Sequence, residues 1–225
     1  MRECLQEVGR TPVHCVERLR AVQPESEASS QQPVLRTLLV SDLEGFTSML
    51  YALGDVAARE VISKHDELLR SSLRAHYGVE RAHTGDGVIA SFIDVRQAVA
   101  CAAAIQLRMR RYNKRAAAAA RFNMRIGVHA GRPLVHENRL FGAAVNTAVR
   151  LCAAASSGEV ILSDAVRELL GESSWCLRDL GELCLKGLPA PIRGFALEWR
   201  DLGSDATRRV HPPRRAAGAE RVYSV

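Results

Sequence analysis

Two aspartates stand at the ends of predicted strands, where their side chains could share a cation. The apolar run Leu35–Val40 is typical of a buried strand, and Asp42 follows this run after one further residue. Asp86 lies at the tip of a predicted hairpin between strands over 79–83 and 87–93, because an Asp-Gly pair is a common hairpin turn. If the hairpin lies beside the first strand, the two carboxylates converge, and they repel each other unless a cation lies between them. Metal pairs about 3.5–4 Å apart commonly carry out phosphoryl transfer, so the pattern favours phosphate chemistry.

The segment after Asp42 reads Leu-Glu-Gly-Phe-Thr over residues 43–47. A tight turn that contains glycine presents several backbone N–H groups, and such groups can hold a phosphate while a neighbouring carboxylate holds its metal. The sequence therefore predicts a phosphate-binding turn directly after the first strand.

A sheet and several helices must position these residues, and the hydrophobic pattern predicts both. Helical periodicity or composition covers residues 55–76, 95–119, 142–155 and 164–170. Further strands are predicted over 121–128, 160–163, 175–180 and 192–199. Because strands and helices do not alternate strictly and a hairpin is present, we expect an α+β sheet with its helices on one face, not a doubly wound parallel sheet.

Four separated stretches resemble the class III nucleotidyl cyclases, the family of adenylate and guanylate cyclase catalytic domains. They cover Thr37–Thr47, Thr84–Phe92, Arg125–Gly131 and Phe141–Leu151, and Leu185–Leu188 also fits. They occur in the family's order between Val34 and Trp199, and several ordered motifs are far more specific than one. The resemblance implies a ferredoxin-like, mostly antiparallel cyclase-homology domain that uses two divalent cations, Mg²⁺ or Mn²⁺. It also implies a nucleoside triphosphate substrate and a head-to-tail homodimer with active sites at the interface.

The resemblance further implies a role for each matching residue. Asp42 and Asp86 correspond to the metal-binding aspartates, with the Leu43 carbonyl as a further ligand. Asn146 corresponds to the residue that orients the ribose, and Arg150, one helical turn further on, to the residue that neutralises charge on the α-phosphate. In the dimer, the two aspartates would come from one subunit, and Asn146 and Arg150 from the other.

The implied reaction is attack of the ribose 3′-hydroxyl on the α-phosphate, with pyrophosphate as the leaving group. The other implied substrate contacts are the turn residues Glu44, Gly45, Phe46 and Thr47, which would cradle the triphosphate, and Lys186 and Arg132, which would reach its terminal phosphates. A solvated surface lysine is the alternative interpretation of Lys186. The reaction needs no dedicated protein base, so we expect structural roles for His83 and His129.

Two positions depart from the adenylate cyclases. Their adenine-reading lysine corresponds to Ala82, and their adenine-reading aspartate corresponds to Arg139. Arginine has five donors and no acceptor, so Arg139 would meet the adenine amino group donor to donor, at a cost of about 1–3 kcal/mol if buried. It would suit a carbonyl-rich base edge, and its size favours a small pyrimidine. The departure resembles the pyrimidine cyclases of bacterial antiphage (Pycsar) systems. We therefore expect UTP as substrate and cyclic UMP as product, then CTP, then ATP in a non-standard pocket.

The two ends of the chain differ in composition from its centre. We expect residues 1–33 to form an N-terminal extension and linker, with room for a short helix over 13–22, residues 34–200 to form the catalytic domain, and residues 201–225 to form a basic, disordered tail. No stretch has the ~20 apolar residues of a membrane span. The N-terminus is too acidic for a signal peptide, and the six cysteines form no Cys-x-x-Cys pair. These features predict a cytoplasmic protein with reduced thiols, no structural zinc and no membrane partner.

Two other functions fit parts of the sequence. A silent cyclase-homology domain would only bind a nucleotide, and absent base-reading residues would be its first sign, but both aspartates, Asn146 and Arg150 are retained. The net charge of +6, about half of it in the basic tail, would suit a nucleic-acid binder. Aromatic residues make up only 5% of the chain, however, so the stacking surface of such a binder is missing.

Overall fold

The computed structural model describes residues 33–137 and 139–202. The first elements are β1 (Arg36–Leu43), α1 (Phe46–Ala75), β2 (Val79–His83), β3 (Gly87–Phe92), α2 (Val95–Asn113), a 3₁₀ turn (Ala118–Ala120) and β4 (Met124–Gly131). The later elements are β5 (Leu134–His136), β6 (Arg139–Phe141), α3 (Ala143–Ala154), β7 (Val160–Ser163), α4 (Asp164–Leu170), β8 (Leu177–Leu183) and β9 (Ile192–Leu197). The helix considered over 13–22 and the tail beyond residue 202 lie outside the described residues. Within those residues, no helix has the length and apolarity required to cross a bilayer.

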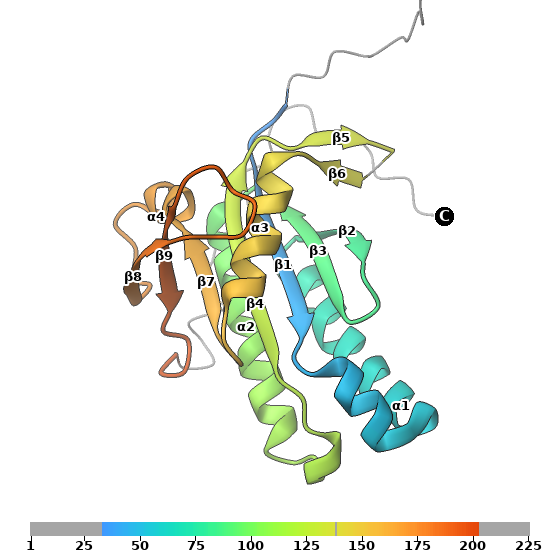
Figure 1. Ribbon diagram of the computed structural model, residues 1–225. Helices are drawn as coiled ribbons and strands as arrows, with labels where there is room; N and C mark the ends of the chain where they lie inside the picture. The colour runs from blue at the N-terminus through green and yellow to red at the C-terminus, as the bar shows by residue number, and fades with distance from the viewer. Residues whose placement is uncertain (1–32, 138, 203–225) are drawn as a thin grey trace, which may run out of the picture. The chain divides into compact units, whose positions relative to one another are not determined.

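Seven strands form one sheet in the order β2-β3-β1-β4-β7-β9-β8, and β5 and β6 form a separate hairpin (Figure 1). Within the large sheet, β4 and β7 pair in parallel and all other neighbours pair antiparallel. The first six regular elements follow the order β-α-β-β-α-β and pair as β2-β3-β1-β4, which is the ferredoxin-like arrangement. The predicted α+β class and the mostly antiparallel sheet are therefore confirmed.

The helices cover both faces of the sheet, so the prediction that they lie on one face is wrong. In Figure 1, α3 lies in front of the sheet, whereas α1 and α2 lie behind it. The alternation of side chains along β1 explains this: Leu39 packs in the core with α1, α2 and α4, and Leu38 packs with Ala148 of α3. Gly127 of β4 lets α3 come close, since a Cβ there would lie 2.3 Å from the Cys152 backbone nitrogen.

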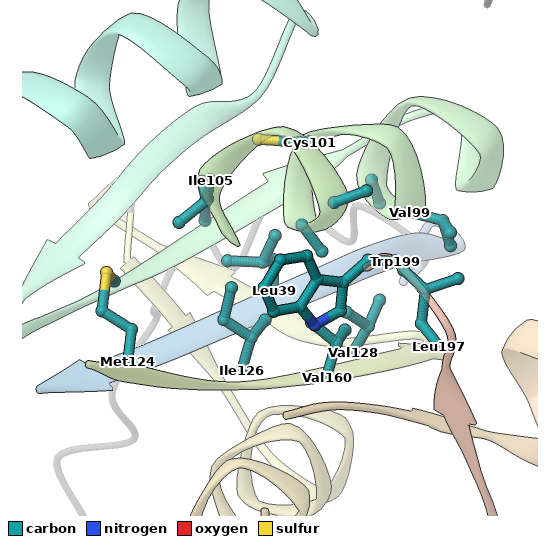
Figure 2. Close-up of a cluster of buried hydrophobic side chains, with 14 of the residues drawn as sticks. Leu39, Val99, Cys101, Ile105, Met124, Ile126, Val128, Val160, Leu197 and Trp199 are labelled. Atoms are coloured by element: carbon teal, nitrogen blue, oxygen red, sulfur yellow. The ribbon is translucent and has the colours of Figure 1, made fainter. Parts of the chain in front are cut away.

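The main core lies between the sheet and α2, and Figure 2 shows Trp199 within it, among Leu39, Ile126 and Val160. Trp199 is buried, and its indole N–H donates to the Gly158 carbonyl oxygen at 2.9 Å, so the buried polar group has a partner. Two of the cysteines are also buried.

Those two cysteines are Cys101, which lies on α2 in Figure 2, and Cys152, which lies on α3. Burial, and after it the negative charge of Asp42, raise the pKa of the Cys152 thiol to about 12. This thiol therefore stays protonated and unreactive at neutral pH. By contrast, Cys176 and Cys184 are exposed.

Several element boundaries differ from the predicted ones. The helix predicted from residue 55 begins at Phe46 and kinks at Gly54, whose φ of 75° is open to glycine but costly for other residues. The helix predicted to run to residue 119 ends at Asn113, because the Asn113 side chain binds the Phe122 backbone N–H at 3.3 Å and C=O at 2.7 Å and turns the chain. The β5–β6 hairpin was not predicted, since each strand has three residues, most of them exposed.

The remaining differences are shifts of strand ends. β1 extends to Leu43 instead of ending at 40, β4 begins at Met124 instead of 121, β8 covers 177–183 instead of 175–180, and β9 ends at Leu197 instead of 199. The extension of β1 is the one that affects the site, because it places Asp42 inside the paired part of the sheet.

Three histidines should make the fold less stable in mild acid. Burial lowers the pKa of His65, His76 and His129 below the ordinary value of 6.5. Below pH 6.5 the unfolded chain therefore binds protons that the native chain does not, so the free energy of unfolding falls as the pH decreases from about 7 to 5. Each histidine contributes at most about 1.4 kcal/mol per pH unit.

Urea unfolding at pH 7.5, 6.5 and 5.5 would measure this effect. Replacing the exposed His136 by glutamine should leave the slope unchanged, whereas replacing the buried His76 by glutamine should reduce it. A free energy of unfolding that stays constant across this range would contradict the prediction.

Candidate active site

Antiparallel pairing of β1 with β3 brings the two predicted metal-binding aspartates to neighbouring positions. Asp42 lies opposite Gly87, and the Leu43 N–H donates to the Asp86 carbonyl oxygen at 2.9 Å. Gly87 is required here, since a Cβ would lie 2.0 Å from the Ser41 carbonyl oxygen. Both aspartate side chains are half-buried at this end of the sheet. The convergence expected from the sequence is therefore present at the backbone level.

Within the described residues, the turn after β1 presents backbone amides that have no hydrogen-bond partner. The Glu44 N–H donates to the Asn123 carbonyl oxygen at 3.0 Å, and Gly45 adopts the left-handed conformation with φ of 66°. The first hydrogen bond of α1 runs from the Met49 N–H to the Gly45 carbonyl at 2.9 Å. The N–H groups of residues 46–48 thus precede the first intrahelical bond. The N-cap residue, Gly45, has no side chain that could accept a hydrogen bond from them. A helix N-terminus of this kind attracts phosphate, as predicted for Glu44–Thr47.

Arg125 of β4 contacts the Asp42 carboxylate directly, a contact that was not predicted from the sequence. Its Nε and Nη2 atoms donate to Asp42 Oδ2 at 2.8 and 2.5 Å, and its Nη1 atom donates to the Ala153 carbonyl oxygen at 3.4 Å. The hydrogen bond to Asp42 raises the pKa of Arg125. The register of β1 against β4 would have indicated this contact, because it places Arg125 opposite Asp42 on the same face of the sheet.

Asn146 and Arg150 lie one turn apart on α3. The Asn146 side chain is exposed and that of Arg150 is half-buried, and the Arg150 Nε atom is buried without a hydrogen-bond partner in the part of the chain described here. Among residues 33–137 and 139–202, no hydrogen bond or ion pair joins either residue to Asp42 or Asp86. Within the described residues, the two sets of candidate residues are therefore not joined by a hydrogen bond or an ion pair.

The other predicted substrate-binding residues are dispersed. Ala82 is half-buried on β2 opposite Ile89, and Lys186 is exposed between β8 and β9. Arg132 donates from Nη1 to the Pro33 carbonyl oxygen at 3.0 Å. Arg139 is exposed at the start of β6, with its guanidinium carbon 5.8 Å from the centroid of the Phe141 ring.

The two histidines have contacts that agree with structural roles. His129 Nδ1 lies 2.9 Å from Ser163 Oγ, which joins β4 to the end of β7. His83 Nε2 lies 3.1 Å from Asp66 Oδ1, which joins β2 to α1. Neither interaction includes Asp42 or Asp86.

The donor atoms at this end of the sheet fit a divalent cation. Asp42, Asp86 and the Leu43 carbonyl offer hard oxygen ligands of the kind that Mg²⁺ and Mn²⁺ prefer. The negative charge of Asp42 is offset by a cationic partner, Arg125, as expected for a carboxylate beside a second one. No cluster of three or more His, Cys, Asp or Glu side chains suited to a metal occurs within the described residues. Phosphate oxygens and water would therefore have to complete the coordination of a bound cation.

The ferredoxin-like sheet, with one aspartate near the end of β1 and a second directly before β3, defines a nucleotide-cyclase type of domain. The sequence profile described as adenylate and guanylate cyclase catalytic domain matches residues 28–199. The chain belongs to this family.

Two relatives illustrate the similarity in sequence. Putative adenylate cyclase 3 of Rhizobium meliloti (strain 1021) is 29% identical over 184 residues, which are 81% of this chain and 30% of that protein. An uncharacterized protein of Mycobacterium tuberculosis (strain ATCC 25618 / H37Rv) is 30% identical over 188 residues, which are 80% of this chain and 60% of that protein. The chain therefore spans less than two thirds of the length of these relatives.

Solved structures agree with the fold. An adenylate/guanylate cyclase/hydrolase from Silicibacter pomeroyi superposes with a TM-score of 0.63 at 29% identity, over 73% of this chain and 96% of that chain. The adenylyl cyclase CyaB from P. aeruginosa superposes with a TM-score of 0.65 at 22% identity, over 75% of this chain and 97% of that chain, which shows a shared fold.

Proposed function

We propose that this chain is a nucleotidyl cyclase that converts a nucleoside triphosphate into a 3′,5′-cyclic nucleotide and pyrophosphate. The observation that carries the proposal is the convergence of three features at one end of the sheet. These are the adjacent positions of Asp42 and Asp86, the unpaired amides at the start of α1, and the Arg125 guanidinium on Asp42. Together they offer cation ligands beside a phosphate-binding turn.

Each group has a defined task in this proposal. The amides of residues 46–48 hold the terminal phosphates, and Arg125 keeps the Asp42 carboxylate in place. When bound, divalent cations would acidify the ribose 3′-hydroxyl and offset the charge of the pyrophosphate leaving group. Asn146 orients the ribose, and Arg150 donates to the α-phosphate oxygens, where charge accumulates during the reaction. Lys186 and Arg132 are assigned to the terminal phosphates.

The proposal includes a head-to-tail homodimer, in which a second copy of the chain supplies Asn146 and Arg150. Its support is the lack of a hydrogen bond or ion pair between the two candidate sets within the described residues of one chain, together with exposed apolar side chains on the β5–β6 hairpin. On that hairpin Leu134, Val135 and Phe141 are 59%, 58% and 43% exposed. Clustered apolar side chains of this kind commonly mark a protein interface.

We further propose UTP as the preferred substrate, followed by CTP and then ATP. Ala82 offers no side-chain donor, and the exposed Arg139 offers donors only, which suits a base edge rich in carbonyl groups. The proposal includes a role in antiphage signalling, because these two positions resemble those of the pyrimidine cyclases of antiphage systems. We assign the reaction to the cytoplasm, where the exposed thiols of Cys176 and Cys184 would stay reduced.

One incubation tests the proposed function. The full chain is mixed with ATP, GTP, CTP and UTP in the presence of Mn²⁺, and the cyclic products are separated and identified by mass. A cyclic UMP or CMP peak that is absent with Asp42→Ala supports the proposal in full. A cyclic AMP peak supports a cyclase but contradicts the base assignment, and no product with any of the four contradicts the proposed activity.

The base assignment predicts a switch of substrate in a double variant. Ala82→Lys with Arg139→Asp restores a donor and an acceptor suited to adenine, so the ratio of kcat/KM for ATP over UTP should rise at least about tenfold. Ala75→Lys with Arg74→Asp is a matched control, because it makes the same two exchanges at exposed positions at the end of α1, to which no substrate contact is assigned. An unchanged ratio in the double variant would show that other groups read the base.

A further inference from the structure

Two side chains outside the proposed catalytic set hold the turn that carries Asp86. His83, the last residue of β2, accepts the Gly85 N–H at its Nδ1 atom at 3.1 Å, and its Nε2 atom lies 3.1 Å from Asp66 Oδ1. Because a backbone N–H can only donate, Nδ1 carries no proton. The proton of the neutral imidazole is therefore on Nε2, where it is donated to Asp66.

Asp66 is in turn fixed to the interior of the domain. Its Oδ1 atom lies 3.1 Å from Nδ1 of His65, which is fully buried, and its Oδ2 atom lies 3.4 Å from Arg70 Nη1. Burial raises the pKa of Asp66, but the hydrogen bonds from His83 and His65 lower it more, so the carboxylate stays ionised. An ionised acceptor with two imidazole partners is a strong anchor for His83.

Two backbone hydrogen bonds close the turn: the Thr84 N–H donates to the Gly87 carbonyl oxygen and the Leu43 N–H to the Asp86 carbonyl oxygen, each at 2.9 Å, and neither includes the Gly85 N–H. Gly85 has φ of 96°, which glycine adopts at low cost but which does not by itself select one orientation of the next residue. Thr84 Oγ1 donates to Asp86 Oδ1 at 3.3 Å, a long and therefore weak contact. The bond from the Gly85 N–H to His83 is the contact through which α1 fixes this turn.

We propose that His83 and Asp66 are a positioning pair that sets the orientation of Asp86 for binding a divalent cation beside Asp42. This inference rests on the proposed function, since that function assigns Asp86 as a metal ligand. Neither His83 nor Asp66 touches the substrate in this scheme. Partners of this kind typically change metal affinity about 10–100-fold when they are removed.

The two contacts of His83 can be removed separately. His83→Asn keeps an acceptor near the position of Nδ1, as in an Asx turn, and His83→Gln keeps a donor near the position of Nε2. His83→Phe keeps a ring and removes both contacts, and Asp66→Ala removes the anchor. Glu80→Gln is the matched control, because Glu80 also joins β2 to α1, through Arg70 at 3.1 Å, but does not contact the turn.

The experiment is a titration of the full-length variants with Mn²⁺ alone, followed by water-proton relaxation, with amide exchange of Gly85 as a second measurement. We expect His83→Phe and Asp66→Ala to weaken Mn²⁺ binding at least about tenfold and to speed Gly85 exchange. His83→Asn should lie nearest to the wild type, and Glu80→Gln should match it. If His83→Phe fails to fold, the comparison of Asp66→Ala with Glu80→Gln tests the same contact.

Wild-type affinity for Mn²⁺ in His83→Phe and Asp66→Ala would overturn the positioning role, as would equal losses in these variants and in Glu80→Gln. No Mn²⁺ binding by the wild type would also overturn it. Mn²⁺ binding that depends on His83 in a protein without any cyclic product would support the positioning role and contradict the proposed function alone. The two failures are therefore distinguishable.

Discussion

Asp42→Asn should reduce the turnover of the proposed cyclase on the order of 10³-fold, which corresponds to about 4 kcal/mol of lost transition-state stabilisation. Asparagine keeps the size and one oxygen of the side chain but loses the charge that binds a divalent cation. Asp42 and Arg125 are 27% and 36% exposed, and ion pairs in such positions contribute under about 1 kcal/mol to stability. The variant should therefore fold normally while losing activity.

Asp179→Asn is the matched control for this experiment. Asp179 is also a strand aspartate held by an arginine, Arg193, but it lies on β8 at the edge of the sheet away from Asp86. The measurement is kcat for formation of the cyclic product, together with the melting temperature of both variants. Turnover within threefold of the wild type in Asp42→Asn would contradict the metal assignment, and equal losses in both variants would indicate a general defect.

The sequence alone was sufficient to predict the pair of strands that carries Asp42 and Asp86. The apolar run before Asp42 and the Asp-Gly turn at Asp86 are local signals, and local signals determine strands and hairpins well. Arg125 was missed because its significance depends on the register of β4 against β1, a contact between positions 83 residues apart. Register of this kind follows from the packing of the whole sheet.

The other misses have the same kind of cause. The alanine run after Lys114 has a high intrinsic helix propensity, but the Asn113 side chain binds the Phe122 backbone and ends α2 earlier. The placement of α3 on the opposite face depends on Gly127, where the lack of a side chain permits close contact with β4. The presence of a single glycine in the sequence of a strand does not indicate which helix packs against that strand.

Arg150→Ala should lower kcat by about 10²–10⁴-fold with a smaller change in KM, because the charge that it neutralises develops in the transition state. The Nε atom of Arg150 is buried and has no hydrogen-bond partner in the described residues, so this donor is not committed to another group there. Arg167→Ala is the matched control, because Arg167 also lies on a helix but donates to the Gly171 carbonyl oxygen at 3.1 Å. An unchanged kcat in Arg150→Ala would contradict its assignment.

Mixing the two inactive variants then tests whether the site is shared between subunits. In a head-to-tail dimer, a subunit with Asp42→Asn can still supply Arg150, and a subunit with Arg150→Ala can still supply Asp42, so each heterodimer contains one intact site. Random exchange at equal amounts makes half of the dimers mixed, and activity should recover to about a quarter of the wild type. The double variant Asp42→Asn with Arg150→Ala is the control: mixed with an equal amount of wild-type chain, each mixed head-to-tail dimer carries one change in each of its two sites, so activity should fall to about a quarter of the wild type, that of the remaining wild-type dimers. No recovery, with exchange of subunits verified by mass, would place the aspartates and Arg150 in the site of a single chain, and the head-to-tail dimer would then be wrong.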